Sequence, residues 1–273
     1  MKARLPSPKG VRFQRVIHSN NLRLWGSGAS RPLPIRVIAI CLFASVCVGA
    51  KAHDSLSADA VQAYLARVTE LQSTLGSGNS AESRAQASLQ LGRTLDDIRE
   101  TFNRDIESHG KVQGLSSNLL ISELAKRGAP LAFSARNGRF TANLGYFRDA
   151  LSLAPTGPIA GDASFRLLAG YFHDSMGDDP LQPVSQSPTQ LNEQIRLGEF
   201  IRRNYPQHAQ RDEGSFILAI CYMQAARAAL DRGARSNLLR SARDIVTAYV
   251  KDYRESFRAT ALTTLLDSFS GEK

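Results

Sequence analysis

The sequence of 273 residues has only three cysteines and one tryptophan, and it contains no familiar catalytic motif. Trp25, Cys41 and Cys47 stand near the start, so only Cys221 remains in the rest of the chain. One cysteine forms no internal disulfide, and the apolar run 216–222 predicts that Cys221 is a buried apolar side chain rather than a reactive thiol. The chain has no Gly-x-Ser-x-Gly turn and no glycine-rich loop after a strand. These absences predict that the protein is not an enzyme.

Acidic residues are missing from residues 1–52, which hold nine of the 34 lysines and arginines. Residues 53–273 therefore carry 25 bases and 25 acids, and the formal net charge of +9 belongs to the first segment alone. A neutral remainder has no whole-domain field that would attract a polyanion. We therefore expect no nucleic-acid partner.

The basic segment 1–52 has the layout of a secretory signal peptide. An uninterrupted apolar run over 37–50 is followed by the small-x-small pattern Ala50-Lys51-Ala52. This predicts cleavage after Ala52, which makes His53 the first residue of the mature chain. The run is short beside the roughly 20 residues of a spanning helix, so an uncleaved anchor is the weaker alternative and no stable membrane span is expected after cleavage. We expect secretion across the inner membrane of a bacterium into the periplasm.

Apolar residues recur at helical spacing after the leader. The pattern predicts one helix that begins at Ser57 and a second that begins at Ser80 or Ser83 and ends at His109. We expect these two helices to form an antiparallel hairpin, which is the N-terminal unit over 53–112.

The next stretch is less regular. A third helix is predicted over 115–124, with Gly128 as its left-handed cap. In 129–140, Asn137-Gly138 could be a tight hairpin turn. The pattern shows no other strand pair for such a hairpin to join, so we expect a loop that leads into the next helix.

The most informative pattern is an internal repeat. Pro155 and Pro206 each follow a predicted helix and stand 51 residues apart, and a weaker third copy places Tyr253 48 residues after Tyr205. At the first offset, Phe165 matches Phe216, Leu167 matches Leu218, and Tyr171 matches Tyr222.

These residues resemble the tetratricopeptide repeat (TPR), a helical hairpin of about 34 residues with an aromatic, a small residue and a closing proline on its second helix. Residues 200–206, followed by 216–222, are also similar to repeats of periplasmic proteins of the Tol-Pal and outer-membrane-assembly groups. Here the spacing is longer, because segments such as 177–191 are inserted between helices. The residues that fit the repeat core are Phe147, Ala150, Pro155, Leu168, Ala169, Phe172, Pro206, Leu218, Ala219 and Tyr222.

The resemblance implies an all-α fold in which the helical hairpins of residues 113–273 stack as a short, right-handed TPR-like solenoid. Gly198 and Ile201 depart from the family pattern in the second copy, and Arg254 replaces the closing proline in the third. An unrelated helical bundle is the alternative. Either way, a helix pair exposes an apolar face that it buries only by stacking on its neighbours.

An acidic segment within the repeat region offers oxygen and imidazole groups to a divalent cation. Residues 177–180, however, are typical of a helix end and turn, where aspartate binds backbone donors. We therefore predict no metal site and no cofactor, and expect these carboxylates to meet the basic stretch 227–258 within the molecule or across a partner interface. The side chains considered are His173, Asp174, Asp178, Asp179 and Glu193.

Two pairs of neighbouring carboxylates invite an acid and base interpretation. Asp96-Asp97 and Asp212-Glu213 are expected on solvent-facing helical turns, as capping and solvation groups. His208 is expected to be a solvated loop residue.

Tyrosine and arginine favour contacts with another protein when they lie on a concave face. We expect the chain to be a secreted, non-enzymatic scaffold that binds an envelope protein or peptide in a groove. The alternative is a helical protein that binds a small ligand or a lipid in a large, enclosed apolar pocket. The residues expected on the partner surface are Tyr205, Tyr249, Tyr253, Arg202 and Arg203.

Overall fold

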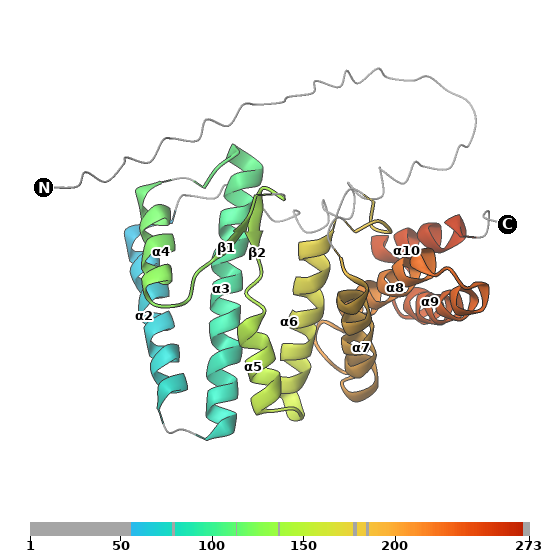
Figure 1. Ribbon diagram of the computed structural model, residues 1–273, viewed down its shortest axis with the longest axis horizontal. Coiled ribbons are helices and arrows are strands. Elements are labelled where there is room, and N and C mark those ends of the chain that lie inside the picture. Colours follow the sequence, from blue (N-terminus) through green and yellow to red (C-terminus); the bar gives the residue numbers. More distant parts are fainter. Residues whose placement is uncertain are drawn as a thin grey trace, which may run out of the picture. The chain divides into compact units, whose positions relative to one another are not determined.

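The computed structural model describes residues 56–77, 80–112, 114–135, 137–176, 179–183 and 186–269, which belong to one compact unit (Figure 1). The predicted signal peptide and its cleavage site at Ala52 and His53 lie outside these residues. Within the described ranges the secondary structure is helical apart from one two-stranded hairpin, so the all-α prediction is confirmed. None of these described helices is both long and apolar enough to cross a membrane.

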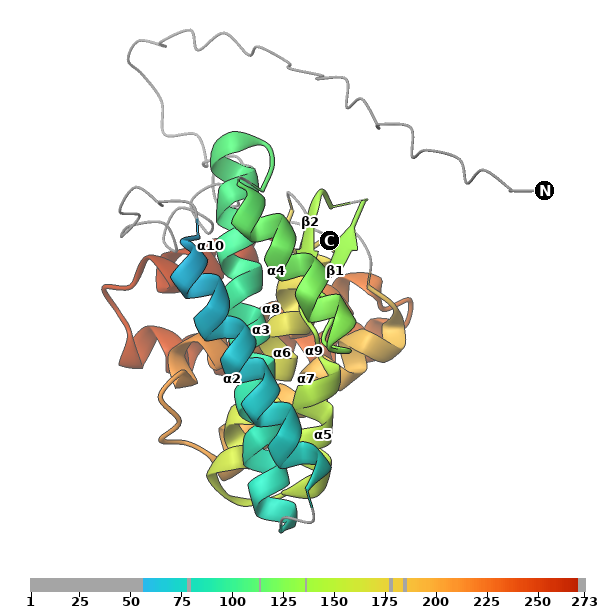
Figure 2. The same ribbon diagram turned by 90° about the vertical axis from the view of Figure 1, so that its left-hand side faces the viewer.

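The first two described helices start at serine caps, as predicted. Ser57 accepts a backbone N–H at 3.1 Å ahead of α2 (Ala58–Gly76), and Ser80 does so at 3.2 Å ahead of α3 (Ala81–His109). A short connection joins the two, and α2 runs antiparallel along α3 (Figure 2). Their shared apolar seam contains Val61, Leu65, Val68, Leu71, Leu91, Leu95, Ile98 and Phe102.

The third predicted helix is also present. α4 (Leu115–Lys126) packs against α2 and adds Leu120 and Leu124 to the same apolar cluster. Gly128 follows with a φ of 71°, a left-handed conformation that glycine adopts without strain.

Most of residues 129–140 belong to a two-stranded β-hairpin rather than to the predicted loop. β1 (Ala132–Ser134) pairs antiparallel with β2 (Arg139–Thr141), and Gly138 lies in the turn with a φ of 64°. The loop prediction was therefore wrong.

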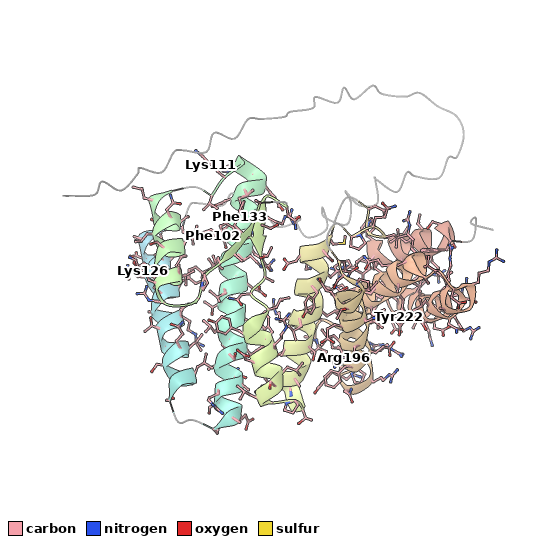
Figure 3. All side chains as sticks on the ribbon, viewed as in Figure 1. Phe102, Lys111, Lys126, Phe133, Arg196 and Tyr222 are labelled. Carbon is pink, nitrogen blue, oxygen red and sulfur yellow. The ribbon has the colours of Figure 1, made fainter. Side chains whose placement is uncertain are left out.

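The hairpin forms because α3 holds it in place. The side-chain amide of Asn103 donates to the Phe140 carbonyl at 2.9 Å and accepts the Phe140 N–H at 2.7 Å. The Phe140 ring also packs against the rings of Phe102 of α3 and Phe133 of β1, both of which are labelled at the upper part of α3 in Figure 3. An isolated two-stranded hairpin is marginal in water, and these contacts supply the missing stability.

Six further helices follow the hairpin within the described ranges. Pro155 and Pro206 each stand just beyond a helix end, as the repeat predicts. The helices are α5 (Gly145–Leu153), α6 (Gly157–Ser175), α7 (Pro188–Asn204), α8 (Arg211–Ala228), α9 (Arg232–Asp252) and α10 (Phe257–Ser268).

These helices pack in a regular order from α3 onward. α5 contacts α3, and each of α6 to α10 contacts the helix before it. α3, α6, α8 and α10 also contact one another in turn and form one layer. α5, α7 and α9 each pack between two neighbouring members of this layer (Figure 1).

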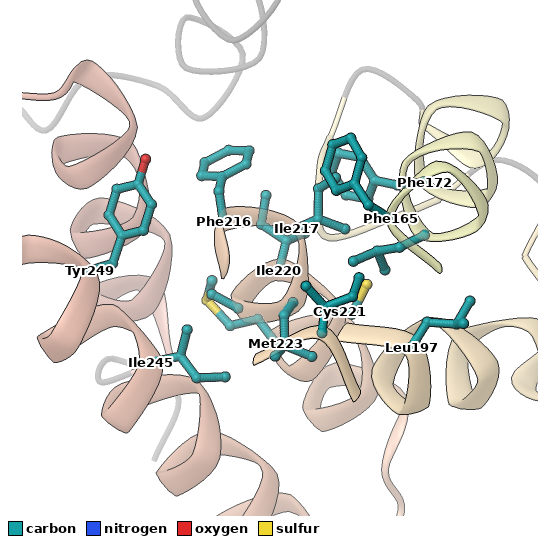
Figure 4. Packing of buried hydrophobic residues seen from close by; sticks show 14 of the residues in the cluster. Phe165, Phe172, Leu197, Phe216, Ile217, Ile220, Cys221, Met223, Ile245 and Tyr249 are labelled. Carbon is teal, nitrogen blue, oxygen red and sulfur yellow. The ribbon is translucent and has the colours of Figure 1, made fainter. Parts of the chain in front are cut away.

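The larger apolar cluster is centred on α8. Residues 216–221 are buried at every position, which is the pattern of a helix that is covered on all sides. Ile217, Ile220 and Met223 of α8 lie between the side chains of α6 and α7 on one side and those of α9 on the other (Figure 4).

Two glycines allow close approach between helices. A Cβ atom on Gly92 of α3 would lie 2.6 Å from the buried ring of Phe147 on α5, and one on Gly198 of α7 would lie 2.7 Å from Leu218 on α8. At Gly198 the family pattern expects an aromatic residue. Here the Leu218 side chain occupies the space that such a side chain on residue 198 would need.

Candidate functional site

A groove of about 250 Å³ lies where α7, α8 and α9 meet. Its lining combines charged groups, hydroxyl groups and apolar atoms, most of them on α9. The lining residues are Glu199, Arg202, Arg211, Ser215, Ser241, Asp244, Ile245, Ala248, Tyr249, Asp252 and Tyr253.

Three of the five predicted partner-surface residues meet in this groove. Arg202 comes from the last turn of α7, whereas Tyr249 and Tyr253 come from the end of α9. The two tyrosine rings lie 4.8 Å apart between centroids. The repeat thus brings together residues that are about 50 positions apart in sequence.

Tyr249 is less accessible than predicted. It is only 3% exposed, and burial raises the pKa of its hydroxyl. It sits on the same side of α9 as Ile245 and Val246, which pack on α8, so most of its ring belongs to the core. Tyr253 is half-buried and is the tyrosine of the pair that a ligand can reach.

Tyr205 is a packing residue rather than a contact residue. Its ring lies against Gly161 of α6, where a Cβ would come within 3.0 Å, and makes an edge contact with Phe200 at 5.5 Å. It does not line the groove. Arg203 is exposed, but it also lies outside the lining.

Glu199 organises the charges on the α7 side of the groove. Its carboxylate accepts hydrogen bonds from Arg202 at 2.8 Å, Arg203 at 3.2 Å and the Tyr222 hydroxyl at 3.1 Å. Burial alone would raise the pKa of Glu199, but the bonds from Arg202 and Tyr222 and the charge of Arg203 outweigh it, and the pKa is lowered. Glu199 therefore stays ionised and holds the two guanidinium groups at the rim.

A second ion pair joins two further residues of the groove lining. Arg211 of α8 donates to Asp252 of α9 at 2.8 Å. The guanidinium groups of Arg202 and Arg211 offer further donors to a carboxylate or a backbone carbonyl. The groove can therefore bind a segment of polypeptide by hydrogen bonds, with Tyr253, Ile245 and Ala248 as its apolar part.

The predicted repeat-core residues lie where helices pack. Half-buried positions are Ala169 and Tyr222, and the exposed positions are Pro155 and Pro206, which end helices. The fully buried ones are Phe147, Ala150, Leu168, Phe172, Leu218 and Ala219.

The prediction that the carboxylate pair at 96–97 faces solvent holds for only one of the two residues. Asp97 is exposed, whereas Asp96 is only 4% exposed. Its carboxylate lies 3.3 Å from Arg99 of the same helix and 3.9 Å from Arg166 of α6. Burial raises the pKa of Asp96 to about 6, against the lowering effect of the two arginines. No local pattern indicates this site, since Asp96 stands beside an exposed Asp97 and its partner Arg166 comes from another helix.

His208 is also buried, which contradicts the prediction of a solvated loop residue. Its Nε2 lies 3.0 Å from Asp162 of α6, which also accepts a bond from Arg93 of α3 at 2.7 Å. The Nδ1 atom accepts the N–H of Gln210, so Nε2 carries the proton that reaches Asp162. With Nδ1 occupied, the imidazole joins α3, α6 and the turn before α8 and offers no free basic nitrogen.

The acidic segment is held by internal contacts. Asp174 accepts the N–H of Ala142 at 3.1 Å, Glu193 pairs with Arg196, and Asp179 lies 3.3 Å from Arg227 in the basic stretch. Asp178 lies outside the described residues. Among the residues that are described, no three His, Cys, Asp or Glu side chains form a group that could hold a metal ion.

The second carboxylate pair, Asp212 and Glu213, was predicted to face solvent, but both residues are only half-exposed. Asp212 accepts a bond from Arg258 of α10 at 3.0 Å. Glu213 lies 3.5 Å from Nε2 of His173, and the hydrogen bond from that imidazole lowers the pKa of Glu213. Both carboxylates join neighbouring helices of the same layer.

Cys221 is buried, as predicted. Burial raises the pKa of its thiol, and its Sγ lies 3.5 Å from the side-chain oxygen of Gln194. The thiol is therefore a packing group.

A larger and shallower hollow of about 640 Å³ lies beside α2 and α3. Most of its lining is polar, and only Leu71, Ala87 and Ile159 are apolar. It is unlike the enclosed apolar pocket expected of a lipid-binding protein.

Comparison with known proteins gives no further guide. No family profile matches the chain, and no curated protein and no solved structure is significantly similar to it.

Proposed function

We propose that the chain is an exported helical-repeat scaffold that binds a segment of a partner protein of the cell envelope in the groove between α7, α8 and α9. The observation that carries this proposal is the meeting of Arg202, Arg211 and Tyr253 around an open groove with an apolar wall. Arginine and tyrosine are the side chains that most often dominate binding at protein interfaces.

The packing order of the helices supports a TPR-like stack. The contacts of α3 with α6, of α6 with α8 and of α8 with α10 are of the kind that a solenoid of helical hairpins requires. In such a stack, grooves run between neighbouring hairpins and accept extended or helical segments. The right-handed solenoid and the TPR relationship are part of the proposal.

Binding rather than catalysis fits the chemistry of the described residues. Asp96 has a pKa near 6, but it lies beneath α6, where a substrate has no access. His208 uses both ring nitrogens within the fold. In the groove, two of the three lining carboxylates, Glu199 and Asp252, are paired with arginines.

Export belongs to the same proposal and rests on the sequence. Residues 37–50 and the pattern before His53 support a cleaved signal peptide, which would place the folded chain in the periplasm. A partner in the cell envelope follows from that location.

The test uses a matched pair of substitutions in the full chain, tagged at its C-terminus. Ala248→Arg introduces a long side chain into the groove, whereas Ala63→Arg makes the same change on an exposed turn of α2. After crosslinking in envelope extracts of the source cells, the bound proteins are identified by mass spectrometry.

We expect one envelope protein to be captured by the wild type and by Ala63→Arg, and to be reduced at least tenfold with Ala248→Arg. Equal capture by all three forms would overturn the groove assignment. If no envelope protein is enriched over an untagged control, the scaffold proposal itself fails.

A further inference from the structure

One face of α9 carries bases and no acids. Residues that follow one another at intervals of three and four along the helix form a single stripe. All of them are exposed, and together they form the basic stripe: Arg232, Ser236, Arg240, Arg243, Thr247 and Lys251.

The four bases of this stripe have no partner within the described part of the chain. Neither a hydrogen bond nor an ion pair is found for Arg232, Arg240, Arg243 or Lys251. Arginines of α7 behave differently, because Arg196 pairs with Glu193 and both arginines of its last turn pair with Glu199. The bases of the stripe are therefore unpaired, whereas these arginines of the neighbouring helix α7 are paired with glutamates.

The first base of the stripe does not stabilise the helix. Arg232 is the first residue of α9, where the positive end of the helix dipole disfavours a base, whereas Lys251 lies in the last turn, where a base is favoured. Asp231, the N-cap of α9, precedes Arg232, and Asp244 borders the stripe on the groove side, where Asp252 is bound to Arg211. None of the four bases is paired with these acids, so their charge is available to something outside the described residues.

We infer that the basic stripe of α9 binds an acidic segment of the partner protein. The stripe spans 19 residue steps, which is about 28 Å along the helix and matches about eight residues of extended polypeptide. Three of its four bases are arginines, whose planar donors match carboxylates in pairs. This inference rests on the proposed function and adds the chemistry of the partner.

A peptide fits the surface better than an anionic membrane does. The stripe contains no apolar or aromatic side chain that would enter a lipid layer. On its groove side lie Asp244 and Asp252, which a broad layer of lipid phosphates would approach together with the bases. A narrow acidic strand can follow the stripe and avoid these carboxylates.

The experiment measures binding of a fluorescein-labelled peptide of ten glutamates by fluorescence anisotropy at low salt. The test variant is Arg240→Glu with Arg243→Glu. Its control is Arg67→Glu with Arg196→Glu, which changes the net charge equally at two exposed sites on α2 and α7 (Arg196 is labelled in Figure 3). Circular dichroism melting checks that both variants fold.

We expect the stripe variant to raise the Kd at least tenfold and the control to raise it less than twofold. A peptide of four glutamates should bind more weakly than the longer one, and physiological salt should weaken both. An equal loss of peptide affinity in the stripe variant and the control variant, or no peptide binding by the wild type, would overturn the inference. Sedimentation with phosphatidylglycerol vesicles that depends on the stripe, without peptide binding, would assign the stripe to lipid instead.

Failure of this inference and failure of the proposed function give different results. If the envelope protein of the crosslinking experiment is lost with Ala248→Arg but retained by the stripe variant, the groove binds a partner without the stripe. If the stripe binds the acidic peptide while no envelope protein is captured, the scaffold proposal fails on its own.

Discussion

At the scale of single residues, Asp96 is the group whose environment differs most from its expected one. Its carboxyl lies under α6, and the two arginines nearby compensate only part of the cost of removing the charge from water. The protonated form is therefore favoured in the folded state up to a pH of about 6. Buried charges of this kind make stability depend on pH.

The sign of that dependence follows from the raised pKa. Between about pH 4, where an unfolded aspartate titrates, and pH 6, the folded state binds more protons than the unfolded state. The contribution of Asp96 to stability is therefore fully present below about pH 4 and is lost as the pH rises through 6. The loss amounts to roughly 2–3 kcal/mol for a shift of this size.

Replacing Asp96 by Asn should remove this loss. We expect the free energy of unfolding of Asp96→Asn, measured with urea, to gain roughly 2–3 kcal/mol relative to the wild type between pH 4 and 7.5. Asp149→Asn, at an exposed position of α5, serves as the control and should run parallel to the wild type. A constant difference between Asp96→Asn and the wild type across this range would show that Asp96 does not titrate as proposed.

At the scale of elements, the sequence predicted what depends on local spacing. Serine caps set the starts of α2 and α3, and left-handed glycines lie just beyond the ends of α3 and α4. Each of these signals lies within a few residues of the helix end, and apolar stripes mark the helices between them. The hairpin could not be predicted in this way. Its stability comes from Asn103, which stands 37 residues before Phe140 and binds its backbone twice.

The same limit applies to the candidate site. Arg202, Tyr249 and Tyr253 were predicted as surface residues because of their type, and the repeat placed them at one groove. Burial could not be predicted for Tyr249 and His208, since it depends on how other helices pack over them: α8 and α10 for Tyr249, and α6, which carries Asp162, for His208. Contacts between helices decide the exposure of such residues, and a single sequence does not encode them at fixed spacing.

Close packing between helices predicts opposite effects for two glycine substitutions. In Gly92→Ala the new Cβ meets the Phe147 ring at 2.6 Å, and the overpacking should outweigh the better helix propensity of alanine. We expect a net destabilisation of about 1–2 kcal/mol. In Gly214→Ala the Cβ lies 3.8 Å from Phe165, so the substitution should stabilise by about 0.5–1 kcal/mol.

Urea unfolding of the two variants at one pH measures both effects. Each glycine lies inside a helix, Gly92 in α3 and Gly214 in α8, so the propensity gain is common to both. If both variants were stabilised, α3 and α5 would not pack as closely as Gly92 and Phe147 indicate.

At the scale of the whole molecule, the buried apolar residues of the described part of the chain form two clusters rather than one. The first joins α2, α3, α4 and the hairpin, and the second joins α5 to α10 with Leu89 of α3. Gly92 and Phe147 lie at the junction, where α3 packs on α5. Each helix thus packs mainly on near neighbours in the chain, as the proposed stack of hairpins requires.

A stack should respond locally to a defect at either end. Leu262→Ala in α10 and Leu65→Ala in α2 each remove a buried side chain and should cost about 2–4 kcal/mol locally. We expect hydrogen exchange followed by mass spectrometry to show faster exchange in α8 to α10 for the first variant and in α2 to α4 for the second, with α6 unchanged in both. Leu230→Ala, at a fully exposed position, should change neither. Faster exchange over all helices in both variants would instead mean that the two clusters unfold as one core, and the proposed stack would be wrong.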